Sequence, residues 1–125
     1  MNGARGFNRA KGRSGENLAL EFLKGNGILI ENVNFFTRGG EIDIVGKDGK
    51  TLVFFEVKYR KDQRSGLPGE SVGFYKIRRI VNSARFYMYR YGYPDTTDVR
   101  FDVIGITGNE IEWIKSAFDC SGMNI

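Results

Sequence analysis

The sequence predicts an α/β domain in which a central mixed β-sheet is flanked by helices. Two amphipathic helical segments alternate with groups of strand-like segments, in the order helix, three strands, helix, two strands. The chain has 125 residues, within the roughly 100 to 200 expected of one domain. We therefore predict one domain at residues 14–119, preceded by a flexible basic arm at 1–13 and followed by a C-terminal tail at 120–125.

The first helix is predicted to begin at Ser14 as its N-cap and to run to about Lys24, where glycines end it. Its apolar residues recur at helical spacing and define a buried side: they are Leu18, Ala19, Leu20, Phe22 and Leu23. Glu16 projects toward this apolar side. Two interpretations remain open, an acid that complements the helix dipole and a carboxylate of a metal site.

Three strands follow the first helix. Residues 27–35 form the first, and residues 40–47 and 50–59 form a hairpin around Asp48-Gly49, a strong signal for a two-residue turn. The hairpin segments are rich in isoleucine, valine, leucine and phenylalanine, as expected of strands that contribute to a core.

The hairpin register places several charged residues together. Pairing Lys47 with Lys50 sets Glu41 opposite Glu56 and makes Asp43 and Glu56 diagonal neighbours, roughly 7 to 8 Å apart, which one cation can bridge. Because side chains alternate, one face carries Glu41, Asp43, Phe54, Glu56 and Lys58. The other face carries Ile42, Ile44, Val53, Phe55 and Val57. Three carboxylates on one face repel one another unless a cation, Lys58 or a proton offsets them, which indicates a site.

The same charges have a simpler explanation. Glu56 with Lys58, or Glu41 with Lys58, could form cross-strand surface ion pairs that stabilise the hairpin by about 0.2 to 1 kcal/mol each. The sequence pattern of the hairpin alone does not separate these two interpretations.

The second half of the chain supplies a basic loop, a long helix and two strands. Residues 60–70 have the glycine-rich, basic composition of a mobile flap, residues 71–91 an amphipathic helix, and residues 99–106 and 110–114 two strands. Tyrosines lie among the arginines of the helix and could stack on bases, although aromatic residues at helical spacing more often belong to a core or an interface: they are Tyr75, Tyr89 and Tyr91.

Composition restricts the chemistry that is available. Nineteen lysines and arginines against fifteen acids give a net charge of +4 and a pI near 9.3, which favours polyanions as partners. The chain has no histidine and one cysteine, Cys120, so histidine-dependent catalysis, an internal disulfide and cysteine zinc clusters are excluded. Hydrolysis would rest on carboxylates, lysines and a hard cation such as Mg²⁺, with Mn²⁺ as a substitute. No apolar run approaches the roughly 20 residues of a membrane span, so we expect a cytoplasmic protein without a membrane partner.

An ordered set of motifs covers the chain from Ser14 to Phe118. An acid on the first helix, Asp43 on one strand and Glu56-x-Lys58 on the next resemble the PD-(D/E)XK nuclease superfamily, including archaeal Holliday-junction resolvases. The whole set more closely resembles the bacterial YraN family of predicted endonucleases: it consists of Gly15-Glu16, Gly40-Glu41-Ile42-Asp43, Phe55-Glu56-Val57-Lys58-x-Arg60, Lys76, Arg100-Phe101-Asp102-Val103 and Ile114-Lys115-x-Ala117-Phe118.

This resemblance implies a restriction-endonuclease-like fold and assigns roles at the hairpin. Asp43 and Glu56 would hold Mg²⁺, with the Val57 carbonyl as a further oxygen ligand. Lys58 would orient the attacking water or stabilise the pentacovalent phosphate. Glu16 would complete the metal shell directly or through water, and Glu41 competes with it for that role.

The basic residues are assigned to the substrate. Lys76, at the start of the long helix, is a predicted phosphate contact, and Arg60, Lys61 and Arg64 would hold the nucleic-acid backbone through a salt-sensitive attraction.

We therefore expect a metal-dependent endonuclease that acts on structured or branched DNA rather than RNA. A junction-cleaving enzyme of this kind would work as a two-fold homodimer. One alternative is a nucleic-acid-binding module with little autonomous activity, which needs a protein partner in a larger repair or uptake assembly. Another is a structural partner protein that retains the acid cluster without using it.

Overall fold

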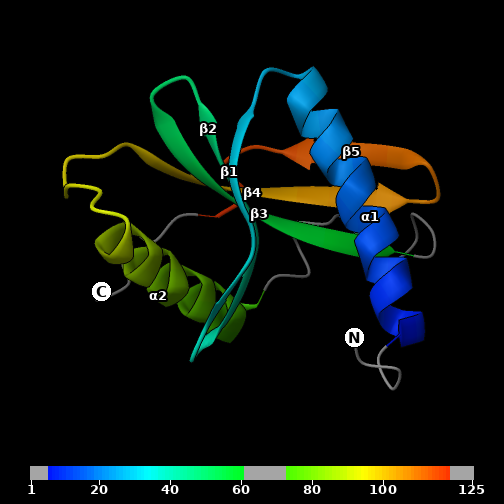
Figure 1. Cartoon of the computed structure of the whole chain (residues 1–125), viewed down its shortest axis with the longest axis horizontal. Coiled ribbons are helices and arrows are strands. Elements are labelled where there is room, and N and C mark those ends of the chain that lie inside the picture. Colours follow the sequence, from blue (N-terminus) through cyan, green and yellow to red (C-terminus); the bar gives the residue numbers. More distant parts are fainter. Residues whose placement is uncertain (1–5, 61–72, 119–125) are drawn as a thin grey trace.

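A five-stranded mixed sheet lies at the centre of the molecule, with one helix on each face (Figure 1). The structure is a computed structural model that describes the backbone of residues 6–60 and 73–118 and the side chains of residues 15–60 and 73–118. The elements are α1 (Gly6–Gly25), β1 (Leu29–Thr37), β2 (Gly40–Asp48), β3 (Thr51–Arg60), α2 (Phe74–Arg90), β4 (Val99–Thr107) and β5 (Glu110–Ile114).

The strands lie in chain order, β1-β2-β3-β4-β5. The first three are antiparallel neighbours, β4 runs parallel to β3, and β5 returns antiparallel to β4. A parallel neighbour requires a crossover, which α2 supplies between β3 and β4. The predicted α/β class, mixed sheet and element order are confirmed, and the arrangement agrees with a restriction-endonuclease-like fold.

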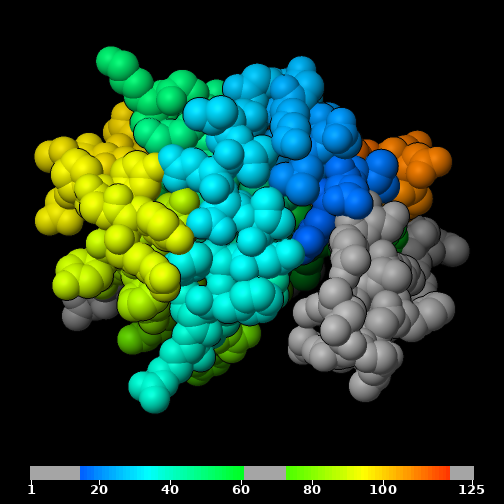
Figure 2. All heavy atoms as spheres, in the orientation of Figure 1, coloured from blue at the N-terminus to red at the C-terminus, as the bar shows by residue number. Residues whose placement is uncertain are grey.

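Two apolar layers hold the helices against the sheet. The layer under α2 contains Phe35, Ile42, Val45, Leu52, Phe54, Ile80, Val81, Ala84, Tyr87 and Phe101. The layer under α1 contains Ala19, Leu23, Ile28, Ile44, Val53, Phe55, Ile104 and Ile106. The space-filling view shows β1 between the two helices, with the β1–β2 turn projecting beside α2 (Figure 2). Within the described residues, neither helix has the length and apolar composition that crossing a membrane requires.

The helix α1 begins at Gly6 rather than at the predicted Ser14. Adding a residue to an existing helix costs less free energy than nucleating a new helix. Helical structure therefore continues into a segment that contains Arg9, Ala10 and Lys11. Residues 1–5 and 119–125, with Cys120, lie outside the described residues, so the domain limits at 13 and 119 stay predictions. The predicted flap lies mostly in residues 61–72, which are also outside the described range.

The predicted hairpin register is wrong by two residues. Asp48 pairs with Thr51 and Ile44 with Phe55, which leaves Gly49 and Lys50 as the turn. Gly49 takes the positive φ, 63°, that such a turn needs, and Asp48 gains a place in the ladder. A shift of two preserves the side-chain faces, because strand side chains repeat every second residue.

Ile42 lies on the opposite face from the one predicted. It packs under α2 with Phe54, whereas Ile44 packs under α1. The β1–β2 pairing passes from Val33–Ile44 to Phe35–Ile42 without a pair at Asn34, whose φ of 56° is left-handed. A left-handed residue interrupts the regular alternation of the pleat, and the interruption falls beside Asp43.

Candidate metal centre

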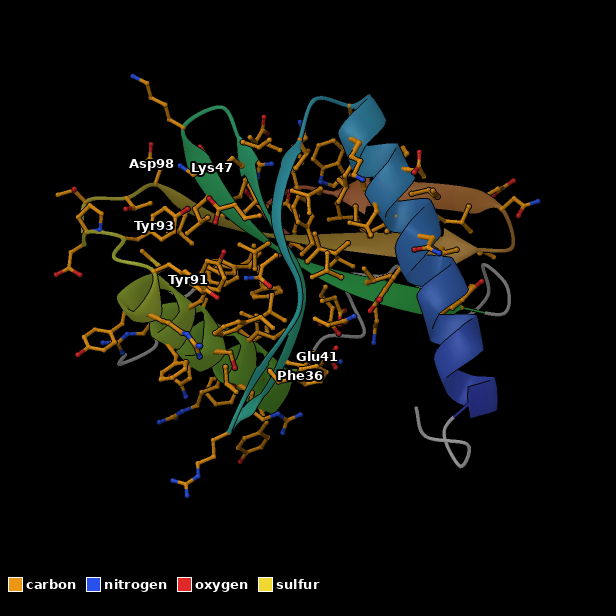
Figure 3. The ribbon with its side chains drawn as sticks, in the orientation of Figure 1. Phe36, Glu41, Lys47, Tyr91, Tyr93 and Asp98 are labelled. Atoms are coloured by element: carbon orange, nitrogen blue, oxygen red, sulfur yellow. The ribbon has the colours of Figure 1, made fainter. Side chains whose placement is uncertain are left out.

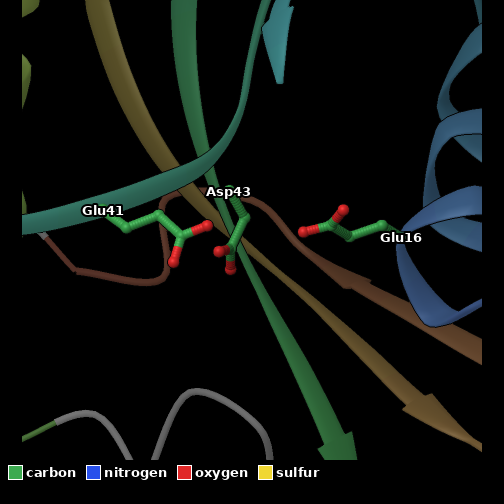
Figure 4. Close-up of side chains that lie close together, drawn as sticks. All are labelled: Glu16, Glu41 and Asp43. Atoms are coloured by element: carbon green, nitrogen blue, oxygen red, sulfur yellow. The ribbon is translucent and has the colours of Figure 1, made fainter. Parts of the chain in front are cut away.

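Three carboxylates converge where β2 parts from β3. Glu16 comes from α1, and Glu41 and Asp43 come from β2. One oxygen from each lies within 4.8 Å of the others. Figure 4 shows the Asp43 carboxylate between those of Glu41 and Glu16, with all three pointing toward one another. The structure thus brings together Glu16 and Asp43, which were predicted as metal ligands, and Glu41, which was predicted to compete with Glu16 for that role.

Close packing of α1 on β3 positions Glu16. A Cβ atom added at the neighbouring Gly15 would lie 2.8 Å from Cε2 of Tyr59, so only glycine permits this approach without a shift. The amide Nδ2 of Asn34 donates a hydrogen bond to Oε1 of Glu16 at 3.0 Å. The helix therefore supplies Glu16, and β1 holds its carboxylate.

Sequence reasoning missed Asn34. Its left-handed backbone carries the side chain toward Glu16, and among the described residues its buried Oδ1 has no hydrogen-bond partner. The available signal was an asparagine inside a strand pattern, because asparagine adopts the left-handed conformation more readily than most residues.

Asp43 is held in a largely buried position. The backbone N–H of Val57 donates to its Oδ2 at 2.8 Å. The pKa of Asp43 is raised to about 7, chiefly by burial and then by the negative charges of Glu56, Glu41 and Glu16, while the Val57 hydrogen bond opposes the rise. The pKa of Glu41 is also raised, chiefly by burial and then by the negative charges of Glu16 and Glu56, while the positive charge of Lys76 lowers it.

Glu56 lies on β3 and is only 7% exposed. Its Oε2 lies 2.6 Å from Nζ of Lys76, which α2 supplies. The corrected register places Asp43 and Glu56 one step beyond the Ile44–Phe55 pair. Glu56 therefore adjoins the carboxylate cluster, and it forms an ion pair with the Lys76 ammonium group.

A pocket of about 520 Å³ opens between the β1–β2 turn and the N-terminal half of α2. Figure 3 shows Phe36 at the end of β1 and Glu41 at the start of β2, beside α2. The pocket is lined by three acids, three cations and two large apolar residues, together with smaller residues of the β1–β2 turn. The charged and large apolar residues are Glu41, Asp43, Glu56, Arg38, Lys76, Arg79, Phe36 and Ile80. A cavity that holds both charge signs suits a phosphate group beside a cation.

The remaining predicted site residues lie along β3 and beyond. Val57 directs its side chain into the layer under α1, and Lys58 is half-buried on β3. The Arg60 side chain is 9% exposed, with Nη2 4.0 Å from Oε1 of Glu112 and with Nε and Nη1 lacking hydrogen-bond partners among the described residues. Lys61 and Arg64 lie outside the described residues. The nucleic-acid contacts assigned to Arg60, Lys61 and Arg64 stay predictions.

Comparison with known proteins places the chain in a family. A family model described as "Uncharacterised protein family UPF0102" matches residues 15–106. The chain belongs to the UPF0102 family. A UPF0102 protein of Chromohalobacter salexigens is 42% identical over 95% of this chain and 98% of its own length. The UPF0102 protein YraN of Escherichia coli O1:K1 is 42% identical over 86% of this chain and 83% of its own, which confirms the resemblance to the YraN family.

Proposed function

We propose that this UPF0102 protein is a metal-dependent endonuclease that hydrolyses phosphodiester bonds in DNA. The observation that carries the proposal is the convergence of Glu16, Glu41 and Asp43, whose oxygens lie within 4.8 Å. Like charges at this separation are costly in a partly buried site, and a divalent cation offsets that cost. The adjoining Lys76 provides a positive group for a phosphate.

The residues at this position fit a hard cation. Every ligand offered is an oxygen, which Mg²⁺ prefers, with Mn²⁺ as a substitute. The pKa of Asp43, near 7 through burial and neighbouring acids, would fall when a cation replaces the proton. The buried Oδ1 of Asn34 is a further oxygen whose hydrogen-bonding capacity the described residues leave unused.

The cation would be held by Glu16, Glu41 and Asp43. Glu56 would become a further ligand by giving up its ion pair with Lys76. When bound, the cation would lower the pKa of a water and neutralise charge on the phosphate. Lys76, released from Glu56, would contact the phosphate across the pocket. Lys58 on β3 and the Val57 carbonyl keep the proposed roles of water positioning and oxygen ligation.

DNA with branches or other irregular structure is the proposed substrate. The basic net charge and the likeness to junction-resolving nucleases support this choice. A two-fold dimer would serve symmetric incision of a junction.

One observation favours a second candidate. The Glu56 carboxylate is already paired with the Lys76 ammonium group at 2.6 Å, so this acid needs no cation to offset its charge. A DNA-binding module with little autonomous activity, which works with a protein partner, would retain this pairing.

Cleavage of end-labelled duplex, flap and four-way-junction DNA in Mg²⁺, Mn²⁺ or EDTA tests the proposal. Asp43→Asn removes a ligand charge with little change in shape, and Glu21→Gln on the exposed side of α1 is the matched control. We expect metal-dependent products from the wild type and the control, and a loss of at least about a hundredfold in Asp43→Asn. Equal DNA binding without metal-dependent cleavage by any of the three proteins would favour the binding module.

A further inference from the structure

The outward side of α2 carries charge of one sign. The segment Phe74–Arg90 contains five basic residues and no acidic residue. All four of its arginines are exposed, and within the described residues none of the four forms an ion pair: they are Arg78, Arg79, Arg85 and Arg90. The side of the helix that faces away from the sheet therefore attracts polyanions.

Large aromatic rings are exposed on the same side. Tyr75 is 76% exposed, Tyr89 is 86% exposed and Phe86 is 49% exposed. Residues at this spacing share one side of a helix, and together with the intervening polar residues they define the α2 outer face: it consists of Tyr75, Arg78, Asn82, Arg85, Phe86 and Tyr89.

We infer that the α2 outer face binds an unpaired DNA strand and leads it to the carboxylate cluster. Exposed rings can stack on unpaired bases, whereas the base faces of a duplex are occupied by neighbouring pairs. The arginines would hold the phosphates between the stacked bases. The inference rests on the proposed function for the destination of the strand, and it narrows the substrate to DNA with a single-stranded segment next to the cleavage site.

The α2 outer face adjoins the pocket, because Tyr75 and Arg78 of the face are chain neighbours of Lys76 and Arg79 in the pocket lining. Arg79 and Lys76 line the pocket from α2, and Phe36, which is 67% exposed, lines it from the end of β1. From Tyr75 to Tyr89 the helix rises about 21 Å, which accommodates several nucleotides of one strand. A strand along this face would thus reach Lys76 and the acids behind it.

Two other occupants fit the face less well. A symmetric dimer through it would set arginines against arginines, without acids on the same helix to pair with them. A membrane surface requires an apolar side of the helix to insert, but that side of α2 is buried on the sheet through Ile80, Val81, Ala84 and Tyr87.

Fluorescence anisotropy with a labelled oligodeoxythymidine of about 16 nucleotides, in EDTA so that no cleavage occurs, tests this inference. Replacing both tyrosines, Tyr75→Ala with Tyr89→Ala, should weaken binding at least about tenfold. The conservative pair, Tyr75→Phe with Tyr89→Phe, should remain within about twofold of wild type, because phenylalanine keeps the stacking surface. Leu29→Ala, at an exposed apolar residue on β1, is the matched control and should not change affinity.

The arginines are tested by salt dependence. Arg78→Ala with Arg85→Ala should reduce the slope of log affinity against log salt by about 1.4, or about 0.7 for each phosphate that the variant no longer neutralises. The matched control, Lys24→Ala at the end of α1, should leave the slope unchanged. An unchanged slope in the arginine variant would overturn the inference.

The remaining outcomes separate the two proposals. The inference would be overturned if Tyr75→Ala with Tyr89→Ala left strand binding unchanged. It would also be overturned if the wild type formed a dimer that this variant dissociates, or bound anionic vesicles that this variant no longer binds. If such variants still cut duplex DNA with Mg²⁺, the nuclease proposal survives alone. If the tyrosine change abolishes strand binding but the wild type never cleaves, the α2 outer face stands as a strand-binding surface and the nuclease proposal fails.

Discussion

Asp43 is a carboxylate whose surroundings oppose its ionisation. Burial is the largest cause of its raised pKa, and Glu56 adds the largest like-charge contribution. A group in this state favours a proton or a cation. In the metal-free protein the proton is the available partner, so protonation of Asp43 links the site to the stability of the fold.

The first prediction concerns pH and stability. The folded pKa of Asp43 is raised from 3.8 to about 7, so the protonated acid favours folding below the unfolded value, and this contribution is lost as pH rises through about 7. Asp43→Asn mimics the neutral acid at every pH. In EDTA, the Tm of the variant minus that of wild type should be positive near pH 8 and should shrink toward pH 4, measured by differential scanning calorimetry.

Adding Mn²⁺ at pH 8 supplies the control for that prediction. The Tm of wild type should rise because the cation takes the place of the proton, while the Tm of Asp43→Asn should change little. A Tm difference that stays constant across the pH range would contradict the assignment of the raised pKa to Asp43.

The second prediction concerns Asn34, which positions Glu16. Asn34→Gly keeps the freedom of φ at 56° but removes the amide, so folding stability should stay near wild type while Mn²⁺ affinity falls about 10- to 100-fold by calorimetry. Asn34→Ala should lose the same affinity and also about 1 kcal/mol of stability, because alanine resists a left-handed backbone. Unchanged Mn²⁺ affinity in both variants would remove the positioning role.

The charged residues of the site could be predicted from the sequence, but Asn34, which orients Glu16, could not. Glu16, Glu41, Asp43, Glu56 and Lys76 all follow from motif and spacing, and all adjoin the cluster or its pocket. The contact of Asn34 with Glu16 spans eighteen positions and depends on an irregular backbone, which periodicity does not encode.

At the scale of elements, β4 and β5 are joined through a buried carboxylate that lies apart from the site. Asp102 is 0% exposed and accepts hydrogen bonds from Nε of Arg100 at 3.0 Å, Nε1 of Trp113 at 2.9 Å and the backbone N–H of Ser116 at 2.9 Å. Arg100 also bonds Asp48 at the end of β2. The pKa of Arg100 is raised, chiefly by its hydrogen bonds to Asp102.

This network gives the third prediction. Asp102→Ala leaves Arg100 and Trp113 without their shared acceptor and should lower the free energy of unfolding by about 3 to 5 kcal/mol, measured by urea denaturation. Asp95→Ala, at an exposed acid in the loop before β4, is the control and should change it by less than about 0.5 kcal/mol. A small effect of Asp102→Ala would show that the network contributes little.

The elements themselves were largely predictable, and the errors fall at their ends and at one turn. Periodicity located both helices and all five strands within a few residues of their observed limits, except at the start of α1. It could not choose between Asp48-Gly49 and Gly49-Lys50 as the turn, because both choices keep the same faces toward the core. It also placed the start of α1 at a good N-cap, Ser14, although the helix begins at Gly6.

At the scale of the whole molecule, the site forms where both helices approach the sheet. α1 brings Glu16, β2 brings Glu41 and Asp43, β3 brings Glu56, and α2 brings Lys76. The order of elements predicted a mixed sheet with a crossover helix, and that topology is enough to place α2 beside β3. The orientation of Glu16 within the site depends on the irregular backbone at Asn34, which sequence periodicity does not encode.

The central claim is that these carboxylates form a divalent-cation centre, and a crystal of the protein grown with Mn²⁺ tests it most directly. We expect an anomalous difference peak within about 2.5 Å of carboxylate oxygens from Glu16, Glu41 or Asp43, absent from Asp43→Asn crystals treated identically. Clear density for all three side chains with no peak between them, or a peak bound only elsewhere, would contradict it.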